Sequence, residues 1–174
     1  MCGAELTPLP EGVQRVTSFL QASGHISMPR MLQDAARTAQ QAADALGVEL
    51  GQIAKSIIFK RKPDDAAVLV ITSGDKRVDE AKVQSLVCHA GSKLGRADAD
   101  FVKLKTGFSI GGVAPVGHLT VPVTLLDQEL FRFETIWAAA GHPNAVFEIS
   151  PQALQMLSQA PVVDVVIDVF VQIL

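Results

Sequence analysis

The segment from Thr106 to His118, TGFSIGGVAPVGH, restricts the backbone more than any other part of the sequence. It holds four of the 13 glycines, and adjacent glycines allow positive φ angles and let main chain approach a ligand with no Cβ in the way. Pro115 fixes its own φ and biases Ala114 toward extended geometry. We therefore expect a shaped loop that presents main-chain N–H and C=O groups, although such glycines can also serve simply as turns. The spacings GxGxxG and GxxxxGK[ST] of nucleotide-binding loops are absent.

Length and composition are typical of one globular domain. The 174 residues are 48% hydrophobic and 19% charged, which argues against disorder. The formal net charge of −3 excludes a protein that is basic overall but leaves room for a local basic face. Cys2 and Cys88 provide neither a disulfide framework nor metal-ligand spacing. We expect a cytosolic protein with no metal and no cofactor.

Neither end of the sequence predicts a membrane segment or a secretion signal. The first residues lack a basic start followed by an apolar run. The apolar tail 162–174 is shorter than the ~20 residues that cross a bilayer, and it contains Asp164 and Asp168. Its β-branched residues fall on alternate positions, which predicts a strand with one wetter face.

Periodicity and capping signals predict alternating helices and strands. Helices are expected over 11–23, after Thr38, after Asp79, after Asp98 and after Ser150; strands are expected over 53–59, 66–72, 121–126, 135–140 and 145–149. The segment 60–65 is expected to be the turn of a hairpin. The fold class is α/β (α+β mixed), in which a mixed twisted sheet with flanking helices forms a single domain over 1–174, with 1–36 as an N-terminal helical extension.

Lys55 is the most unusual charge in the chain. It stands in the apolar strand pattern Ile53 to Phe59, where a lysine either extends its ammonium to the surface or points into a pocket. In a pocket it would bind an anion or have a lowered pKa. Both alternatives stay open from these residues alone.

The remaining polar candidates are weaker. His142, in a turn before a proline, and His118, at the end of the glycine-rich segment, are either exposed turn residues or proton-handling groups. Five basic residues fall in what should be neighbouring turns: Lys60, Arg61, Lys62, Lys76 and Arg77. They form either a solvated rim or a phosphate-contacting patch beside Lys55. Trp137 is the only tryptophan and there is no tyrosine, so an aromatic base-stacking platform is not expected.

An ordered set of these motifs resembles the YbaK family, also called the prolyl-tRNA-synthetase-associated domain. The resemblance runs from about Arg37 to Val163. Its pieces, in the family's order, are AKSIIF around Lys55, the turn SGDKRVD, the glycine-rich segment, the turn AGHPN and the helix start Ser150-Pro151. Members of this family are editing domains, free-standing or fused to a synthetase, that hydrolyse the ester between a wrong amino acid and the 3′-terminal adenosine of tRNA.

The resemblance implies roles for particular residues. Lys55 would contact the phosphate or the terminal adenosine and hold the ester. The backbone of Gly111 and Gly112, in the GxxxP element that continues through Val113 and Ala114 to Pro115, would bind the amino-acid end and position a hydroxyl or a water. Lys55 and Gly111 are thus the expected catalytic positions. His142 matches a position in the amino-acid pocket that varies within the family.

The sequence therefore predicts a cytosolic, trans-acting aminoacyl-tRNA deacylase whose partner is the 3′ end of a mischarged tRNA, most simply a proline tRNA. A synthetase partner, the oligomeric state and the edited amino acid (alanine, serine, threonine or cysteine) stay open. The leading alternative is a non-catalytic module that binds tRNA or a synthetase. The third alternative is an esterase or thioesterase for a small acyl substrate.

Overall fold

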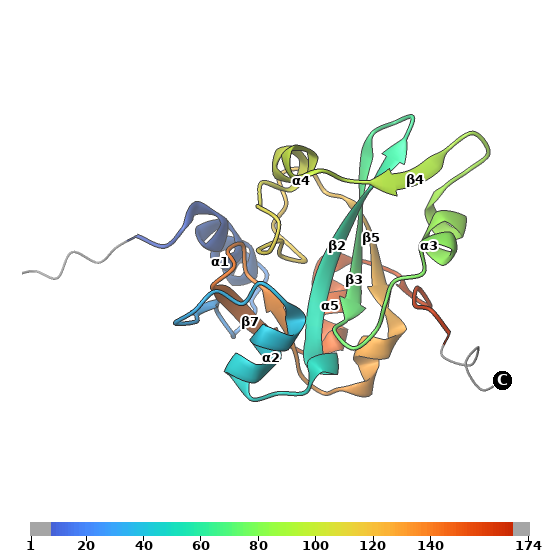
Figure 1. The fold of residues 1–174 in the computed structure, drawn as a ribbon. Coiled ribbons are helices and arrows are strands. Elements are labelled where there is room, and N and C mark those ends of the chain that lie inside the picture. Colours follow the sequence, from blue (N-terminus) through green and yellow to red (C-terminus); the bar gives the residue numbers. More distant parts are fainter. Residues whose placement is uncertain (1–7, 169–174) are drawn as a thin grey trace, which may run out of the picture.

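The computed structural model describes residues 8–168 and shows an eight-stranded mixed sheet with helices on both faces (Figure 1). The α-helices are α1 (Glu11–Ala22), α2 (Ala39–Leu46), α3 (Glu80–Val87), α4 (Ala99–Thr106) and α5 (Pro151–Ser158), and the 3-10 helices are η1 (Leu50–Gln52) and η2 (Gln128–Arg132). The strands are β1 (Arg30–Met31), β2 (Ile53–Lys62), β3 (Ala66–Ser73), β4 (Lys93–Arg96), β5 (Val123–Asp127), β6 (Ile136–Ala139), β7 (Ala145–Ile149) and β8 (Val162–Val163). The predicted fold class is confirmed.

The strand order is β1-β7-β6-β2-β3-β5-β8, with β4 added to β2. The central hairpin β2–β3 is antiparallel and extends over eight residue pairs, from Ala54–Ser73 to Arg61–Ala66. The β6–β7 hairpin is also antiparallel, whereas β6 joins β2, and β5 joins β3, in parallel. Short hairpins and helix-linked parallel strands therefore occur in one sheet, as the sequence predicts.

Local capping signals determine where α2, α3 and α4 begin. Thr38 and Gln41 form the predicted capping box at the start of α2, and Gly47 ends that helix in the left-handed conformation. The carboxylates of Asp79 and Asp98 accept hydrogen bonds from the first turns of α3 and α4. These boundaries depend on contacts two to four residues apart, which is why the sequence predicts them.

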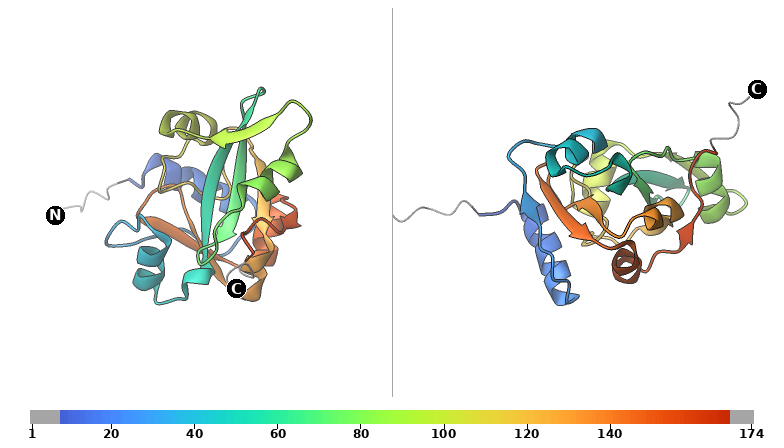
Figure 2. Two further views of the ribbon diagram at one scale, coloured as in Figure 1. Left: turned by 45° about the vertical axis from the view of Figure 1, so that its right-hand side comes forward. Right: turned by 90° about the horizontal axis from the view of Figure 1, so that it is seen from below.

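The sheet separates two apolar clusters. Leu69 and Ile71 of β3 face a cluster built with α1, α4, α5 and the glycine-rich loop. Val68 and Val70, the alternate residues of the same strand, face α3 and the segment after β8. Seen from below, α1 and α5 lie on one side of the sheet and α2 on the other (Figure 2).

Strand β2 is longer than predicted. Lys60, Arg61 and Lys62 were expected in a turn, but they are the last residues of β2 because Lys60 and Arg61 pair with β3 and all three pair with β4. The sequence does not predict β4, because this segment is short and polar and contains Gly95. It forms a strand by pairing with β2, which is distant in sequence.

The predicted strand over the tail is also corrected. Ordered pairing in this region is limited to β8 and a bridge between Val166 and Val78, and residues 169–174 of the predicted strand lie outside the described residues. Val165 and Val166 are both buried, so the simple alternation does not hold beyond β8. No helix in residues 8–168 combines the length and the apolar character that crossing a bilayer requires.

Candidate functional site

The sheet is interrupted along one edge of β2. Strand β6 pairs with this edge only at Ile53 and Ala54, and β4 joins it only from Phe59 onward. Residues 55–58 therefore have a strand partner, β3, on one side only. A cavity of about 310 Å³ opens beside this interruption.

Segments distant in sequence line the cavity, and Figure 1 shows them converging to the left of β2. They are 36–39 and Ala42 at the start of α2, 53–57 of β2, three residues of the glycine-rich loop (Ile110, Gly111 and Val113), and 137–139, Pro143 and 145–146 of the β6–β7 hairpin. Seven of these 19 residues are alanine. The small side chains leave space that larger ones would fill, and the lining is mostly apolar.

Lys55 supplies a partly buried cation to this lining. Its Nζ donates a 2.7 Å hydrogen bond to the carbonyl of Lys76, in the turn that follows β3. Burial lowers the pKa of Lys55 below that of an ordinary lysine, and the charges of Asp75 and Asp127 oppose this shift. One acceptor leaves further ammonium N–H groups available to a ligand.

The two carboxylates near Lys55 are held by other donors. Arg132 binds Asp75 in a fork, with distances of 2.7 and 3.1 Å, and lowers the pKa of that carboxyl. Asp127 is buried and accepts hydrogen bonds from the Thr72 hydroxyl and from main-chain N–H groups. Among residues 8–168 no carboxylate lies within ion-pair distance of the Lys55 ammonium.

Arg15 of α1 ties both ends of the glycine-rich loop. Its Nε donates to the carbonyl of Gly117 at 2.8 Å, and its Nη2 donates to the carbonyl of Thr106 at 3.3 Å. The guanidinium also lies over the ring of Phe108, 4.5 Å from the centroid. The planar guanidinium of Arg15 can make these three contacts at the same time. Helix α1 therefore helps to hold the glycine-rich loop in place.

The glycine-rich loop also packs against the β6–β7 turn. A Cβ on Gly112 would lie 2.8 Å from the backbone of His142, so a side chain does not fit there. Gly111 has a φ of +94°, in the region that favours glycine. The N–H of Gly112 donates to the Ser109 carbonyl, whereas the N–H groups of Gly111 and Val113 have no acceptor in the described part of the chain.

The structure places the predicted site residues in two groups. Those that line the cavity are Lys55, Gly111 and Val113. Those that do not line it are Gly112, Ala114, Pro115 and His142. Ala114 is fully buried in the main core, and Gly112 is pressed against the turn. The residues of the second group therefore stabilise the loop and the turn without lining the cavity.

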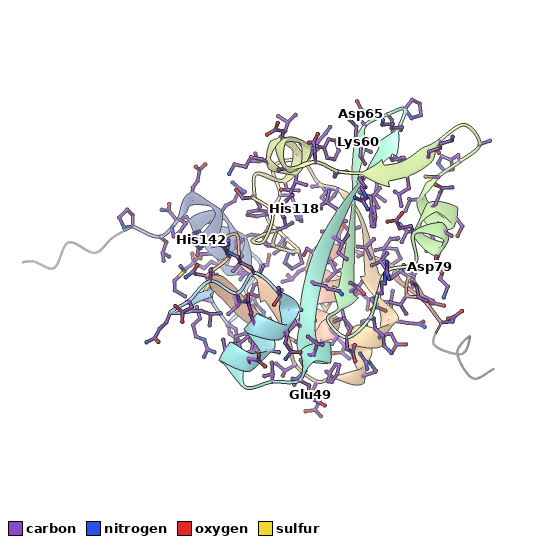
Figure 3. The ribbon with its side chains drawn as sticks, viewed as in Figure 1. Glu49, Lys60, Asp65, Asp79, His118 and His142 are labelled. Atoms are coloured by element: carbon purple, nitrogen blue, oxygen red, sulfur yellow. The ribbon has the colours of Figure 1, made fainter. Side chains whose placement is uncertain are left out.

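The two histidines beside the site have different surroundings (Figure 3). His118 donates from Nε2 to the Ala114 carbonyl at 2.7 Å, and its ring stands edge-on to Phe108. Burial lowers the pKa of His118 to about 4, so this ring is neutral near pH 7. His142 accepts a 3.1 Å hydrogen bond at Nδ1 from the N–H of Asn144. Both contacts stabilise loop geometry.

Comparison with known families agrees with this geometry. The model of the aminoacyl-tRNA editing domain matches residues 33–157. The chain belongs to this family. The resemblance to YbaK-type editing domains is thereby confirmed, and the matched range contains every segment that lines the cavity.

Three relatives show which known proteins this editing domain is similar to. The uncharacterized protein YwhH of Bacillus subtilis is 36% identical over 121 residues, which are 70% of this chain and 74% of YwhH. EbsC of Enterococcus faecalis, named as a candidate Cys-tRNA(Pro)/Cys-tRNA(Cys) deacylase, is 26% identical over 70% of this chain and 72% of its own. The proline–tRNA ligase of Maridesulfovibrio salexigens is 31% identical over 60% of this chain but only 17% of the ligase.

A solved structure gives the same result for the fold. It is described as a candidate trans-editing enzyme for prolyl tRNA synthetase, and it superposes with a TM-score of 0.84 at 37% sequence identity. The superposition covers 92% of this chain and 100% of the other. The shared structure is therefore larger than the range that the family model matches.

In this editing domain the five basic residues do not form one patch. The first three end β2 at the far tip of the hairpin, where Figure 3 labels Lys60, whereas Lys76 and Arg77 follow the opposite end of β3. The whole of β3 separates the two groups, so the expectation of neighbouring turns is wrong, and the alternative of one phosphate-contacting patch beside Lys55 does not hold. Lys60 and Arg61 are also paired with carboxylates of their own turn, Asp65 and Asp64.

Several residues that line the cavity were not predicted to do so. Ser56, Trp137 and the start of α2 line the cavity, and the exposed Arg37 adds a second cation at its rim. The alanine stripe of α2 predicted close helix packing, but the same small side chains also make room for the cavity. Ser56 could have been noticed as a hydroxyl in an apolar strand pattern. Within residues 8–168, no three His, Cys, Asp or Glu side chains are grouped to hold a metal ion.

Proposed function

We propose that this editing domain is a trans-acting aminoacyl-tRNA deacylase. It hydrolyses the ester between a small non-cognate amino acid and the 3′-terminal adenosine of tRNA, with proline tRNA as the first substrate to test. The observation that carries the proposal is the alanine-lined cavity of about 310 Å³ with Lys55 on its wall. The proline–tRNA ligase and the candidate Cys-tRNA(Pro) deacylase among the relatives support the choice of tRNA.

The chemistry requires little beyond positioning. An aminoacyl ester is already activated, so its hydrolysis depends on holding the carbonyl, orienting the attacking oxygen and stabilising the developing negative charge. The main-chain N–H groups of Gly111 and Val113, which lack an internal acceptor, are suited to that charge. They are fixed by the Arg15 contacts and by the packing of the loop on the turn.

Lys55 binds the nucleotide end of the substrate in this proposal. Its ammonium has one carbonyl acceptor and no carboxylate partner in residues 8–168, so a phosphate or a ribose oxygen completes its coordination. Arg37 at the rim adds a positive charge for the tRNA backbone. Pro115, Ala114 and Gly112 preserve the loop conformation, and His142 preserves the turn.

The size of the cavity provides the selection. Replacing one methylene in a binding pocket changes affinity by only about 1–3 kcal/mol, which is why a second, hydrolytic site is useful after misacylation. Alanine side chains at 39, 42, 138 and 145 admit a small aminoacyl group. We expect the pyrrolidine ring of the cognate proline to be excluded by the same walls.

We also propose that α1 belongs to the same folding unit as the matched range and is no separate extension. Gly12 packs so closely against Gly141 that a Cβ on Gly12 would overlap the Gly141 carbonyl. Together with the Arg15 contacts, this makes α1 a support for both the loop and the turn. The substrate reaches the domain in trans, in the cytosol where tRNA is charged, and a tRNA synthetase is the second partner to test.

A deacylation panel tests the proposal. Proline tRNA charged separately with alanine, serine, cysteine, threonine and proline is incubated with the protein, and the remaining ester is followed over time. The expected result is hydrolysis of one or more small aminoacyl groups with prolyl-tRNA spared. If charged tRNA or a synthetase binds while every ester survives at the uncatalysed rate, the non-catalytic binding module replaces the deacylase.

A further inference from the structure

Within the described chain, the cavity lining has no acidic side chain that could bind an amino group. Its charged side chains are those of Lys55 and Arg37, both cations, and it contains no histidine, asparagine or glutamine. Of its two hydroxyls, the Ser56 Oγ is inaccessible to solvent, and the Thr38 Oγ1 already accepts the Gln41 N–H as the cap of α2. In the proposed function, on which this inference rests, the substrate brings an α-amino group with several N–H donors, and donors left unpaired in a pocket are costly. Main-chain carbonyls are the acceptors that remain.

The interrupted edge of β2 supplies main-chain groups without partners. Neither β6 nor β4 pairs with residues 55–58 on this edge. Successive residues of a strand direct their N–H and C=O groups to opposite edges, so either Ser56 or Ile57, in the middle of the interruption, directs both groups away from β3. No main-chain hydrogen bond joins 55–58 to a helix or a loop within residues 8–168. One N–H and one C=O of β2 therefore face the interruption unpaired.

The main chain at this interruption forms part of the cavity wall. Ser56 and Ile57 both line the cavity. The only polar side-chain atom of Ser56 is inaccessible, so this residue faces the cavity through its main chain or its Cβ. Ala54 and Ala138 line the cavity although their side chains pack in the main core. The backbone of the sheet, where β6 leaves β2, is therefore a surface that a ligand meets.

Several other carbonyls of the lining already have donors. Those of Thr38, Pro143 and Ala145 accept main-chain N–H groups. The carbonyls of the glycine-rich loop at 110–113 are the competing acceptors. In the proposed function, however, the N–H groups of this loop bind the acyl oxygen, so the edge of β2 offers a second wall for the amino group on the neighbouring carbon.

We propose that the unpaired main-chain carbonyl of β2, at Ser56 or Ile57, accepts a hydrogen bond from the α-amino group of the bound aminoacyl ester. The amino group is then held by a peptide dipole instead of an ion pair, which suits a lining whose charged side chains are cations. With the acyl oxygen at the loop and the amino group at β2, two substituents of the reacting centre are fixed. The site thus selects α-aminoacyl esters over acyl esters that lack the amino group.

The kinetic test removes the amino group from the substrate. Proline tRNA is charged with the aminoacyl group that the deacylation panel identifies, with its α-hydroxy analogue and with its deamino analogue. Each rate is divided by the rate of the same ester in buffer, because the three esters differ in intrinsic reactivity. We expect the acceleration to be lower by about tenfold for the deamino ester, with the α-hydroxy ester, whose hydroxyl can still donate, in between.

A variant excludes the remaining side-chain acceptor. Thr38→Val removes the accessible hydroxyl of the lining and should leave the ratio of amino to deamino acceleration unchanged. This ratio does not depend on the folded fraction, so it stays informative even if the loss of the cap destabilises α2. A ratio that falls to one in Thr38→Val would assign the amino group to that hydroxyl and overturn the inference.

Binding locates the contact without turnover. Non-hydrolysable 3′-amide adenosines that carry an alanyl or a propionyl group are added to isotope-labelled protein, and the NMR shifts of the main-chain carbonyl carbons are compared. The alanyl analogue should shift the carbonyl of Ser56 or Ile57, and the propionyl analogue should not. The carbonyls of Lys60 and Arg61, which have strand partners on both sides of β2, are the control and should not move.

The outcomes separate this inference from the proposed function. Equal accelerations for the amino and deamino esters, or alanyl-specific shifts confined to the loop carbonyls at 110–113, would overturn the inference while leaving the deacylase intact. Absence of hydrolysis for every ester would instead remove the proposed function.

Discussion

Two partly buried lysines on the same face of the sheet have opposite surroundings. Lys82 of α3 donates to the carboxylates of Asp164 and Asp168, each at 3.0 Å, and to the Val166 carbonyl at 2.7 Å. These contacts attach the end of the described chain to α3, and they raise the pKa of Lys82. Lys55 has a single carbonyl acceptor, and burial lowers its pKa.

The difference separates a lysine used for structure from one kept for a ligand. A lysine ammonium has three N–H donors, and at Lys82 three internal acceptors are within hydrogen-bond distance. At Lys55 the nearby carboxylates are held by Arg132 and by main-chain groups, so in residues 8–168 its ammonium has a single internal acceptor, and the residue lines the cavity. Unsatisfied cations beside a cavity are candidates for substrate binding.

The largest expected effect follows directly from this difference. Lys55→Ala should lower kcat/KM for mischarged tRNA by about 100-fold, because it removes a charged contact to the substrate. Its melting temperature should stay near that of the wild type, since Lys55 makes only one internal hydrogen bond. Steady-state deacylation and thermal melting check both statements. Equal activity losses in Lys55→Ala and Lys82→Ala would remove the distinction between the two lysines.

The stability of the protein should also depend on pH through His118, at the end of the glycine-rich loop. The pKa of His118 is about 4 in the folded protein and about 6.5 in the unfolded chain. Between these values only the unfolded chain binds a proton, so the free energy of unfolding should fall by up to about 3 kcal/mol as the pH decreases from 6.5 to 4. Urea unfolding over this range should show the slope, and His118→Gln should flatten it. If the free energy of unfolding fell equally with pH in the wild type and in His118→Gln, His118 would not be the source of the pH dependence.

A smaller effect is expected for the support of the loop. Arg15→Ala should cost about 2 kcal/mol in the free energy of unfolding, because two hydrogen bonds to loop carbonyls and one contact with the Phe108 ring are lost. Activity should fall with it, about tenfold, as the loop loses its fixed geometry. Ser18→Ala, an exposed neighbour on α1, is the control for both measurements. Wild-type activity in Arg15→Ala would show that the loop holds its shape without α1.

The smallest effect on catalysis is expected for the other lysine. Lys82→Ala should leave kcat/KM within about twofold of the wild type, because its partners lie on the tail and away from the cavity. It should lower the melting temperature modestly, and more so at low ionic strength, since exposed ion pairs are screened by salt. Thermal melts at two salt concentrations, run beside Lys55→Ala, complete the comparison.

The sequence predicted what short-range signals determine. The capping box at Thr38, the Asp79 and Asp98 caps and the Ser150-Pro151 helix start are all confirmed, as is the β2–β3 hairpin. Each of these depends on residues that are close in sequence. The position of Lys55 in a strand was predicted for the same reason.

What the sequence could not supply depends on long-range geometry. Strand β4 exists because it completes an edge of β2, and the cavity exists because β6 leaves that edge after Ala54. The length of β3 determines how far Lys76 and Arg77 lie from the basic residues at the end of β2. The absence of a carboxylate partner for Lys55 in residues 8–168 depends on Arg132, which binds Asp75. These features involve segments up to about a hundred residues apart, and no local pattern encodes them.

Single-turnover hydrolysis at saturating protein tests most directly whether this cavity hydrolyses aminoacyl esters. Seryl- or cysteinyl-tRNA for proline is mixed with excess protein, and the surviving ester is followed beside a gel-shift measurement of tRNA binding. We expect the wild type to clear the ester at least about 100-fold faster than buffer and to spare prolyl-tRNA. Bound tRNA whose ester decays at the buffer rate would contradict the deacylase and leave a binding module.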